Sequence, residues 1–147
     1  MKIDTATPTA DKRGSLILLV DDHPINRVVL FKQLDVLGYA VEIAADGRQA
    51  LDKWKAGGVG AIITDCHMPG LSGYELTRQI RASEAATGAG HIPIIACTAN
   101  ALGGEAEDCF AAGMDDYLSK PIGLQRLAEK LDQWLPITAA VRANRQA

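Results

Sequence analysis

Acidic, hydroxyl and amino side chains in this chain sit just beyond apolar runs. The side chains are Asp21, Asp22, Asp65, Thr98 and Lys120. Three carboxylates in one cleft would repel one another unless a cation compensated for their charge. Mg²⁺ is the hard cation that best suits such oxygen ligands. Because an aspartate can accept a phosphoryl group, the pattern predicts Mg²⁺-dependent phosphoryl transfer to Asp65, assisted by Lys120 and the Thr98 hydroxyl.

The apolar runs predict five β-strands, and a helical segment follows each of them. Strands that alternate with helices form a parallel sheet with helices on both faces, the α/β class. The carboxyl ends of all strands then open at one edge, where ligands bind. The candidate side chains are therefore expected to converge there. The predicted strands are residues 15–20, 39–44, 61–64, 92–97 and 115–118.

Capping signals predict where several helices begin. Pro24 opens the first helix, and Asp46 and Ser72 occupy N-cap positions of the next two. The first helix carries apolar residues on two sides, which predicts a buried helix in the centre of its layer. The segment Ser83 to His91 is polar and predicts a mobile loop. The remaining helices are predicted at residues 105–112 and in a segment bearing Leu124, Leu127, Leu131, Trp134 and Leu135 that ends at Pro136.

Length and composition indicate one globular domain. We expect residues 15–136 to form it, with flexible segments at 1–14 and 137–147, in a chain of 147 residues. The net charge of −3 gives no general attraction to nucleic acid. No apolar run approaches the ~20 residues that span a bilayer. Three widely spaced cysteines fit reduced thiols. We expect a cytoplasmic protein without direct nucleic-acid or membrane contact.

Each candidate residue also has a simpler interpretation when it is taken alone. Asp21 and Asp22 could cap the first helix, and Asp65 could be a turn residue. Thr98 could bond to backbone, and Lys120 could be a solvated charge. Their occurrence in order at successive strand ends favours a shared site.

The ordered set resembles the receiver domain of two-component response regulators. The motifs that carry the resemblance are Val20-Asp21-Asp22, Asp65 followed by Met68-Pro69-Gly70 and Gly73, Thr98-Ala99, and Lys120-Pro121. The resemblance covers residues 15–135. It implies a three-layer, flavodoxin-like (βα)5 fold with a doubly wound parallel sheet in the order 2-1-3-4-5.

The resemblance also implies a role for each matching residue. Asp65 would be the phosphoacceptor, Lys120 would bind the phosphoryl group, and Thr98 and Tyr117 would form the switch. Phosphorylation would then alter the surface of the fourth helix, fifth strand and fifth helix. The Lys120-Pro121 bond is expected to be cis. Mg²⁺, or Mn²⁺ as a substitute, would be held by Asp21, Asp22, Asp65 and the backbone carbonyl of His67; His67, Ala99 and Asn100 would form the rim.

The stretch from Asp21 to Arg27 is similar to receivers inside hybrid sensor histidine kinases. The implied partners are a histidine kinase transmitter or a histidine-phosphotransfer domain, with the chain a monomer or weak homodimer. Two alternatives remain open. One is a phosphohydrolase of the haloacid-dehalogenase kind, although that family has a second Asp two residues after the nucleophile, where this chain has His67. The other is a receiver-like interaction module that is never phosphorylated.

Overall fold

The computed structural model describes residues 16–135, which form a five-stranded parallel sheet in the order β2-β1-β3-β4-β5. This confirms the predicted fold class and strand order. The expected terminal segments, 1–14 and 137–147, and the helix end at Pro136 lie outside the described residues. The strands are β1 (Ile17–Val20), β2 (Val41–Ala44), β3 (Ala61–Asp65), β4 (Ile94–Thr98) and β5 (Asp116–Ser119).

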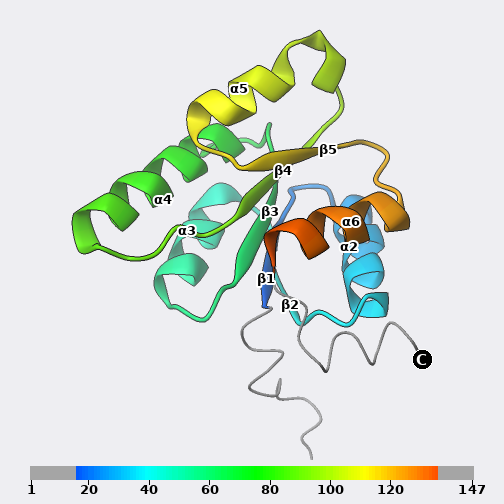
Figure 1. Cartoon of the computed structure of the whole chain (residues 1–147), viewed down its shortest axis with the longest axis horizontal. Coiled ribbons are helices and arrows are strands. Elements are labelled where there is room, and N and C mark those ends of the chain that lie inside the picture. The colour runs from blue at the N-terminus through cyan, green and yellow to red at the C-terminus, as the bar shows by residue number, and fades with distance from the viewer. Residues whose placement is uncertain (1–15, 136–147) are drawn as a thin grey trace, which may run out of the picture.

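Helices cover both faces of the sheet. Helices α2 and α6 lie over one face, and α3, α4 and α5 lie over the other (Figure 1). Two apolar clusters fill the spaces between these layers. Among the helices of residues 16–135, none is long and apolar enough to span a membrane. The helices are α2 (Pro24–Val36), α3 (Gly47–Lys55), α4 (Gly73–Thr87), α5 (Glu105–Ala112) and α6 (Leu124–Trp134), with a short 3₁₀ helix, η1 (Ala101–Gly103).

The predicted helix starts are confirmed. Pro24 begins α2. The Asp46 carboxylate accepts a hydrogen bond from the Gln49 N–H at 2.8 Å, and the Ser72 hydroxyl accepts one from the Glu75 N–H at 3.2 Å. Each side chain satisfies an amide that has no partner within the helix. These caps fix where α3 and α4 begin.

The loop predicted from Ser83 is wrong over its first half, because α4 continues to Thr87. Buried Glu84 explains the extension. Its carboxylate accepts hydrogen bonds from Arg81 at 2.9 Å and from the Ile92 N–H at 2.8 Å. These contacts tie the last turns of α4 to the segment that enters β4. The helix ends at Gly88, whose positive φ of 74° suits glycine.

The prediction that the first helix is buried on all sides is also wrong. In α2, Leu30 and Leu34 are buried, whereas Ile25 is 78% exposed and Val29 50% exposed. The cause lies in the topology. Leu30 and Leu34 pack in the apolar cluster between α2 and the sheet. Helix α2 lies in an outer layer, and no further layer of the described residues covers its solvent side (Figure 1).

Candidate functional site

The predicted carboxylates meet at the carboxyl edge of the sheet. Strands β1 and β3 are neighbours, with Val20 opposite Thr64, so the chain leaves the sheet at adjacent points. Asp21, Asp22 and Asp65 each offer a carboxylate oxygen, and these oxygens all lie within 4.8 Å of one another. The sequence prediction that the three acids converge is confirmed.

This acidic cluster has the properties of a cation site. Burial raises the pKa of Asp21, and the charges of Asp65 and Asp22 act in the same direction, against a hydrogen bond from the His23 N–H. Oδ1 of Asp22 is buried and has no hydrogen-bond partner among residues 16–135. A buried acceptor without a donor is costly unless a ligand satisfies it. The oxygen donor set and the unpartnered oxygen fit Mg²⁺.

Lys120 joins the same cluster from β5. Its Nζ lies 3.2 Å from Oδ1 of Asp65. Its backbone N–H donates to the Thr98 carbonyl at 2.8 Å, and the bond to Pro121 is cis, as expected. Burial disfavours the charged ammonium, but the attraction of Asp65 and Asp21 outweighs burial and raises the pKa of Lys120. Lys120 is therefore a fixed positive charge beside Asp65.

Gly73 explains how the turn after Asp65 can be so tight. The N–H of Gly73 donates to the Cys66 carbonyl at 3.0 Å, which brings the start of α4 against the end of β3. A Cβ at this position would lie 2.2 Å from the Asp65 carbonyl oxygen. Only glycine allows this approach without a shift of the backbone.

Thr98 ends β4 and is buried, and its hydroxyl is engaged by an acid that the sequence analysis did not select. The hydroxyl donates to Oε1 of Glu105, and the same Thr98 oxygen accepts from the Asn100 N–H at 3.1 Å. Oε2 of Glu105 lies 2.5 Å from Nε2 of His67. Glu105 therefore links the loops that follow β3 and β4.

Glu105 could not be found from spacing alone. It follows η1 and Gly104, whose φ of 98° redirects the chain into α5. Neither feature was predicted. A buried hydroxyl at the end of β4 calls for an acceptor, and the first acid of the following helix is the signal that could have indicated it.

The remaining predicted residues lie around this edge. Tyr117 is half-buried, and its ring packs edge-on against that of Phe110, with the two ring centroids 6.1 Å apart. Ala99 and Asn100 are exposed immediately after Thr98. The His67 side chain is 70% exposed, and its ring packs edge-on against that of Tyr74, with the two ring centroids 5.7 Å apart. The ring of His67 thus contacts Glu105 and Tyr74, and the metal-binding role expected of its backbone carbonyl stays a prediction.

Several simpler interpretations do not fit these contacts. The N-cap of α2 is His23, so the acidic pair does not serve only to cap that helix. Lys120 is paired with Asp65 instead of being freely solvated. The backbone contact expected of Thr98 is present, but it accompanies the bond to Glu105.

Together, the doubly wound sheet and the acidic edge with its lysine define a receiver-type α/β protein. Residues 17–132 match the family described as Response regulator receiver domain. The chain belongs to this family. This sets aside the haloacid-dehalogenase alternative, which the histidine at position 67 had already disfavoured.

The curated relatives are sensor kinases. The chain is 48% identical over 130 residues to the virulence sensor protein BvgS of Bordetella pertussis, matching 87% of this chain and 10% of BvgS. It is 40% identical over 131 residues to the sensor histidine kinase RcsC of Escherichia coli, matching 86% of this chain and 13% of RcsC. The chain therefore spans roughly a tenth of the length of these relatives.

Two solved structures bear on the site. One is the receiver domain of the Pseudomonas aeruginosa sensor histidine kinase PA1611, with magnesium coordinated in its active site cleft; it is 46% identical, with a TM-score of 0.74, covering 82% of this chain and 97% of that one. The other is the Saccharomyces cerevisiae receiver domain of Ssk1, crystallised with the histidine phosphotransfer protein Ypd1. It is 32% identical, with a TM-score of 0.77, covering 81% of this chain and 87% of that one.

Proposed function

We propose that Asp65 accepts a phosphoryl group from a phosphohistidine in a Mg²⁺-dependent reaction, and that the domain thereby relays a signal. One observation carries this proposal. Asp65 has two further carboxylates within 4.8 Å, which can share a cation, and the Lys120 ammonium at 3.2 Å. A nucleophilic carboxylate with positive charge on both sides suits phosphoryl transfer.

Asp21, Asp22, Asp65 and the backbone carbonyl of His67 would hold the metal ion. The buried, unpartnered Oδ1 of Asp22 supports this assignment. Mg²⁺ supplies positive charge that stabilises the phosphoryl oxygens, and Mn²⁺ can substitute because it prefers similar ligands. The magnesium in the cleft of the PA1611 receiver agrees with this choice.

In the proposed step, a carboxylate oxygen of Asp65 attacks the phosphorus of the phosphohistidine. An O–P bond forms while the P–N bond breaks, and the electron pair of that bond stays on the imidazole nitrogen. The Lys120 ammonium stabilises the phosphoryl oxygens as the bond changes, because it is already in place at 3.2 Å. The second ring nitrogen of the phosphohistidine carries a proton, so the imidazole leaves as a neutral ring. The products are an aspartyl phosphate and a neutral histidine on the donor.

The new group brings about −1.5 to −2 of charge and strong acceptor oxygens. We infer that Thr98 turns its hydroxyl from Glu105 to this group and that Tyr117 moves into the vacated space. Tyr117 contacts Phe110 of α5, so its movement would change the surface formed by α5, β5 and α6. The phosphorylated state is favoured only by these differential contacts.

The exposed flank of α2 supports docking of the phosphohistidine donor. Ile25 and Val29 are exposed at the end of α2 nearest the acidic cluster. A groove of about 450 Å³ lies between α2 and Pro121-Ile122, and both Asp21 and Lys120 line it. An apolar surface beside the acceptor suits a partner that must bring its histidine to Asp65.

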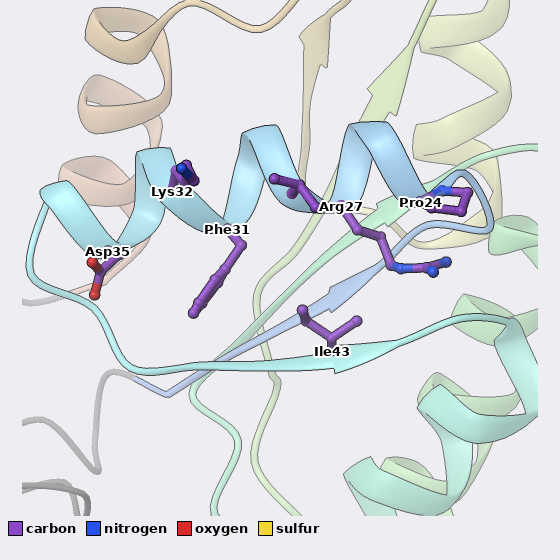
Figure 2. A pocket seen from close by; sticks show the side chains of 7 residues that line it. Pro24, Arg27, Phe31, Lys32, Asp35 and Ile43 are labelled. Atoms are coloured by element: carbon purple, nitrogen blue, oxygen red, sulfur yellow. The ribbon is translucent and has the colours of Figure 1, made fainter.

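A second groove, of about 530 Å³, lies on the opposite flank of α2 (Figure 2). Phe31 extends from α2 toward β2, where Ile43 lies, and Arg27 lines the end near Pro24. Helix α2 is thus an apolar ridge with a groove on each side. We propose that a histidine-phosphotransfer domain or a kinase transmitter contacts this ridge. The similar receiver domain of Ssk1 was crystallised with a partner of the first kind, Ypd1.

The proposal places this receiver within, or beside, a hybrid sensor histidine kinase in the cytoplasm. Its support is the similarity to BvgS and RcsC. The chain would act as a monomer or weak homodimer. Phosphotransfer profiling tests this part: kinases and histidine-phosphotransfer proteins are incubated with the chain, and transfer of labelled phosphate is followed over time. Rapid transfer from one partner is expected, and no transfer from any partner would contradict the proposal.

An assay with phosphate monoesters separates receiver function from hydrolysis. We expect stoichiometric uptake from acetyl phosphate with Mg²⁺ and no sustained turnover of monoesters. Sustained turnover would favour a hydrolase. Absence of uptake from acetyl phosphate and from phosphohistidine donors would favour an interaction module.

A further inference from the structure

We propose that Glu105 is a positioning residue that holds the Thr98 hydroxyl and the His67 ring in the resting state and thereby weakens uptake of the phosphoryl group. This inference rests on the proposed function, because it concerns the resting state of that same site. Glu105 is the first residue of α5, and its side chain is 13% exposed. Its carboxylate lies between the loops that follow β3 and β4.

The two oxygens of Glu105 have different partners. Oε1 accepts the hydroxyl proton of Thr98, and Oε2 lies 2.5 Å from Nε2 of His67. The carboxylate is thus held at both ends. It also lies at the N-terminus of α5, where the helix dipole favours negative charge.

The Thr98 hydroxyl can serve only one acceptor at a time. A threonine hydroxyl has a single proton to donate, and in the resting structure Glu105 receives it. The same oxygen accepts from the Asn100 N–H at 3.1 Å, which further fixes the hydroxyl. To receive a hydrogen bond from Thr98, a phosphoryl group on Asp65 must therefore replace Glu105 as the acceptor of that hydroxyl. Uptake includes the cost of leaving a largely buried carboxylate with one donor fewer.

His67 gives Glu105 a partner that does not depend on Thr98. When Thr98 turns away, Oε2 of Glu105 keeps its contact with the His67 ring, so the carboxylate is not left alone. The His67 backbone belongs to the loop that carries Asp65, and Glu105 belongs to the helix next to the switch. Glu105 therefore connects acceptor loop and switch hydroxyl through a side chain that does not itself bind the phosphoryl group.

Binding of beryllofluoride, a phosphoryl analogue, tests this role. The full chain is titrated with beryllofluoride and Mg²⁺, and the Kd is measured for the parent, Glu105→Ala, Glu105→Gln and the control Glu107→Gln. Glu107 is an exposed acid in the same first turn of α5, so its substitution makes the same change in helix charge. We expect Glu105→Ala to bind roughly five- to tenfold more tightly than the parent, a typical coupling between sites.

The near-isosteric Glu105→Gln keeps an acceptor for Thr98 but loses the charge, so an intermediate gain is expected. Glu107→Gln should match the parent. An unchanged or weaker affinity in Glu105→Ala and Glu105→Gln, with a parent that binds beryllofluoride, would overturn the role of Glu105 alone. A parent that does not bind beryllofluoride at all would instead overturn the proposed function.

Repeating the measurement in a Thr98→Ala variant shows whether Glu105 acts through Thr98. In Thr98→Ala the competing hydroxyl is absent, so adding Glu105→Ala should leave the Kd of beryllofluoride unchanged. The non-additivity of this double-mutant cycle measures the competition. An equal gain in affinity in both backgrounds would show that Glu105 acts only by its charge, which would overturn the positioning role. A change in thermal stability alone, without this non-additivity, would do the same.

Discussion

The ammonium of Lys120 lies 3.2 Å from Oδ1 of Asp65, although β4 separates β3, which ends at Asp65, from β5, which ends just before Lys120. The approach is possible because the Lys120 backbone is anchored to the end of β4, where its N–H donates to the Thr98 carbonyl at 2.8 Å. The side chain then crosses to β3. This arrangement places a positive charge of the protein's own directly beside Asp65.

Removing that charge should slow phosphorylation. In Lys120→Ala the Asp65 carboxylate keeps its two acidic neighbours but loses its ammonium partner. We expect the rate of uptake from acetyl phosphate to fall by about 10²-fold, the usual effect of removing one stabilising donor. The control is Lys55→Ala, an exposed lysine at the end of α3. Equal rates in Lys120→Ala and the parent would contradict the role of Lys120.

The contact between Gly73 and Asp65 leads to a prediction about stability and function together. Gly73→Ala would place its methyl carbon only 2.2 Å from the Asp65 carbonyl oxygen, which is too close for van der Waals contact. We expect a loss of about 1–3 kcal/mol in the free energy of unfolding, as in other overpacked sites, and slower phosphorylation because Asp65 is displaced.

The matched control is Gly123→Ala, since nothing lies within 4 Å of a Cβ at Gly123. Denaturant unfolding and acetyl phosphate uptake are measured on both variants. If Gly73→Ala proved as stable and as active as Gly123→Ala, the tight turn would not be what positions Asp65.

The exposed ridge of α2 predicts a selective defect in transfer. Val29→Asp puts a charge where the groove beside Lys120 is apolar, so docking of a phosphohistidine donor should weaken. Uptake from acetyl phosphate, which needs no docking surface, should change little. Val36→Asp at the far end of α2, where Val36 is 60% exposed, is the control. Equal transfer rates for Val29→Asp and Val36→Asp would place the donor elsewhere.

Asp116 gives a pH-dependent prediction that is independent of the metal site. Burial alone would raise the pKa of Asp116, but hydrogen bonds from the Trp134 indole and the Tyr117 N–H outweigh it. The Lys130 ammonium, 3.0 Å away, acts in the same direction. The net result is a pKa below the ordinary value of 3.8. Asp116 therefore stabilises the fold fully at pH values above its ordinary pKa. This stabilisation is lost as the pH falls through the lowered pKa.

We expect Asp116→Asn to reduce the free energy of unfolding by about 2 kcal/mol at neutral pH, because hydrogen bonds to a charged group are lost. The difference from the parent should shrink in acid. Denaturant unfolding across a pH series measures this, with exposed Asp52→Asn as the control. A difference that stayed constant, or grew as pH fell, would be inconsistent with the lowered pKa.

Much of the fold was predictable because the three central strands, β1, β3 and β4, are short, largely apolar and fully buried. The run before Asp21 and the run before Asp65 are continuous, as expected for central parallel strands. The order of polar residues at the strand ends then predicted the acidic cluster, since all these ends share one edge. Continuous apolar runs and capping residues were sufficient to predict these strands and helix starts, because both depend on residues close in the sequence.

The failures came where tertiary contacts decided the outcome. The length of α4 depends on Glu84 and its bonds to Arg81 and Ile92, which no local pattern shows. The exposure of Val29 depends on the position of α2 in an outer layer, where only the side toward the sheet is covered. Likewise, the contact between Glu105 and Thr98 depends on the turn at η1.

The most direct test of the central claim is phosphotransfer to Asp65 itself. The parent and Asp65→Asn are incubated with Mg²⁺ and a labelled phosphohistidine donor, and the phosphorylated residue is located by mass spectrometry. Asp22→Asn serves as the comparison, because it removes a neighbouring carboxylate but leaves the acceptor. We predict one phosphoryl group on Asp65 of the parent, slower uptake at the same residue in Asp22→Asn, and none in Asp65→Asn. Uptake by Asp65→Asn equal to that of the parent, or a phosphoryl group located on another residue of the parent, would contradict the account.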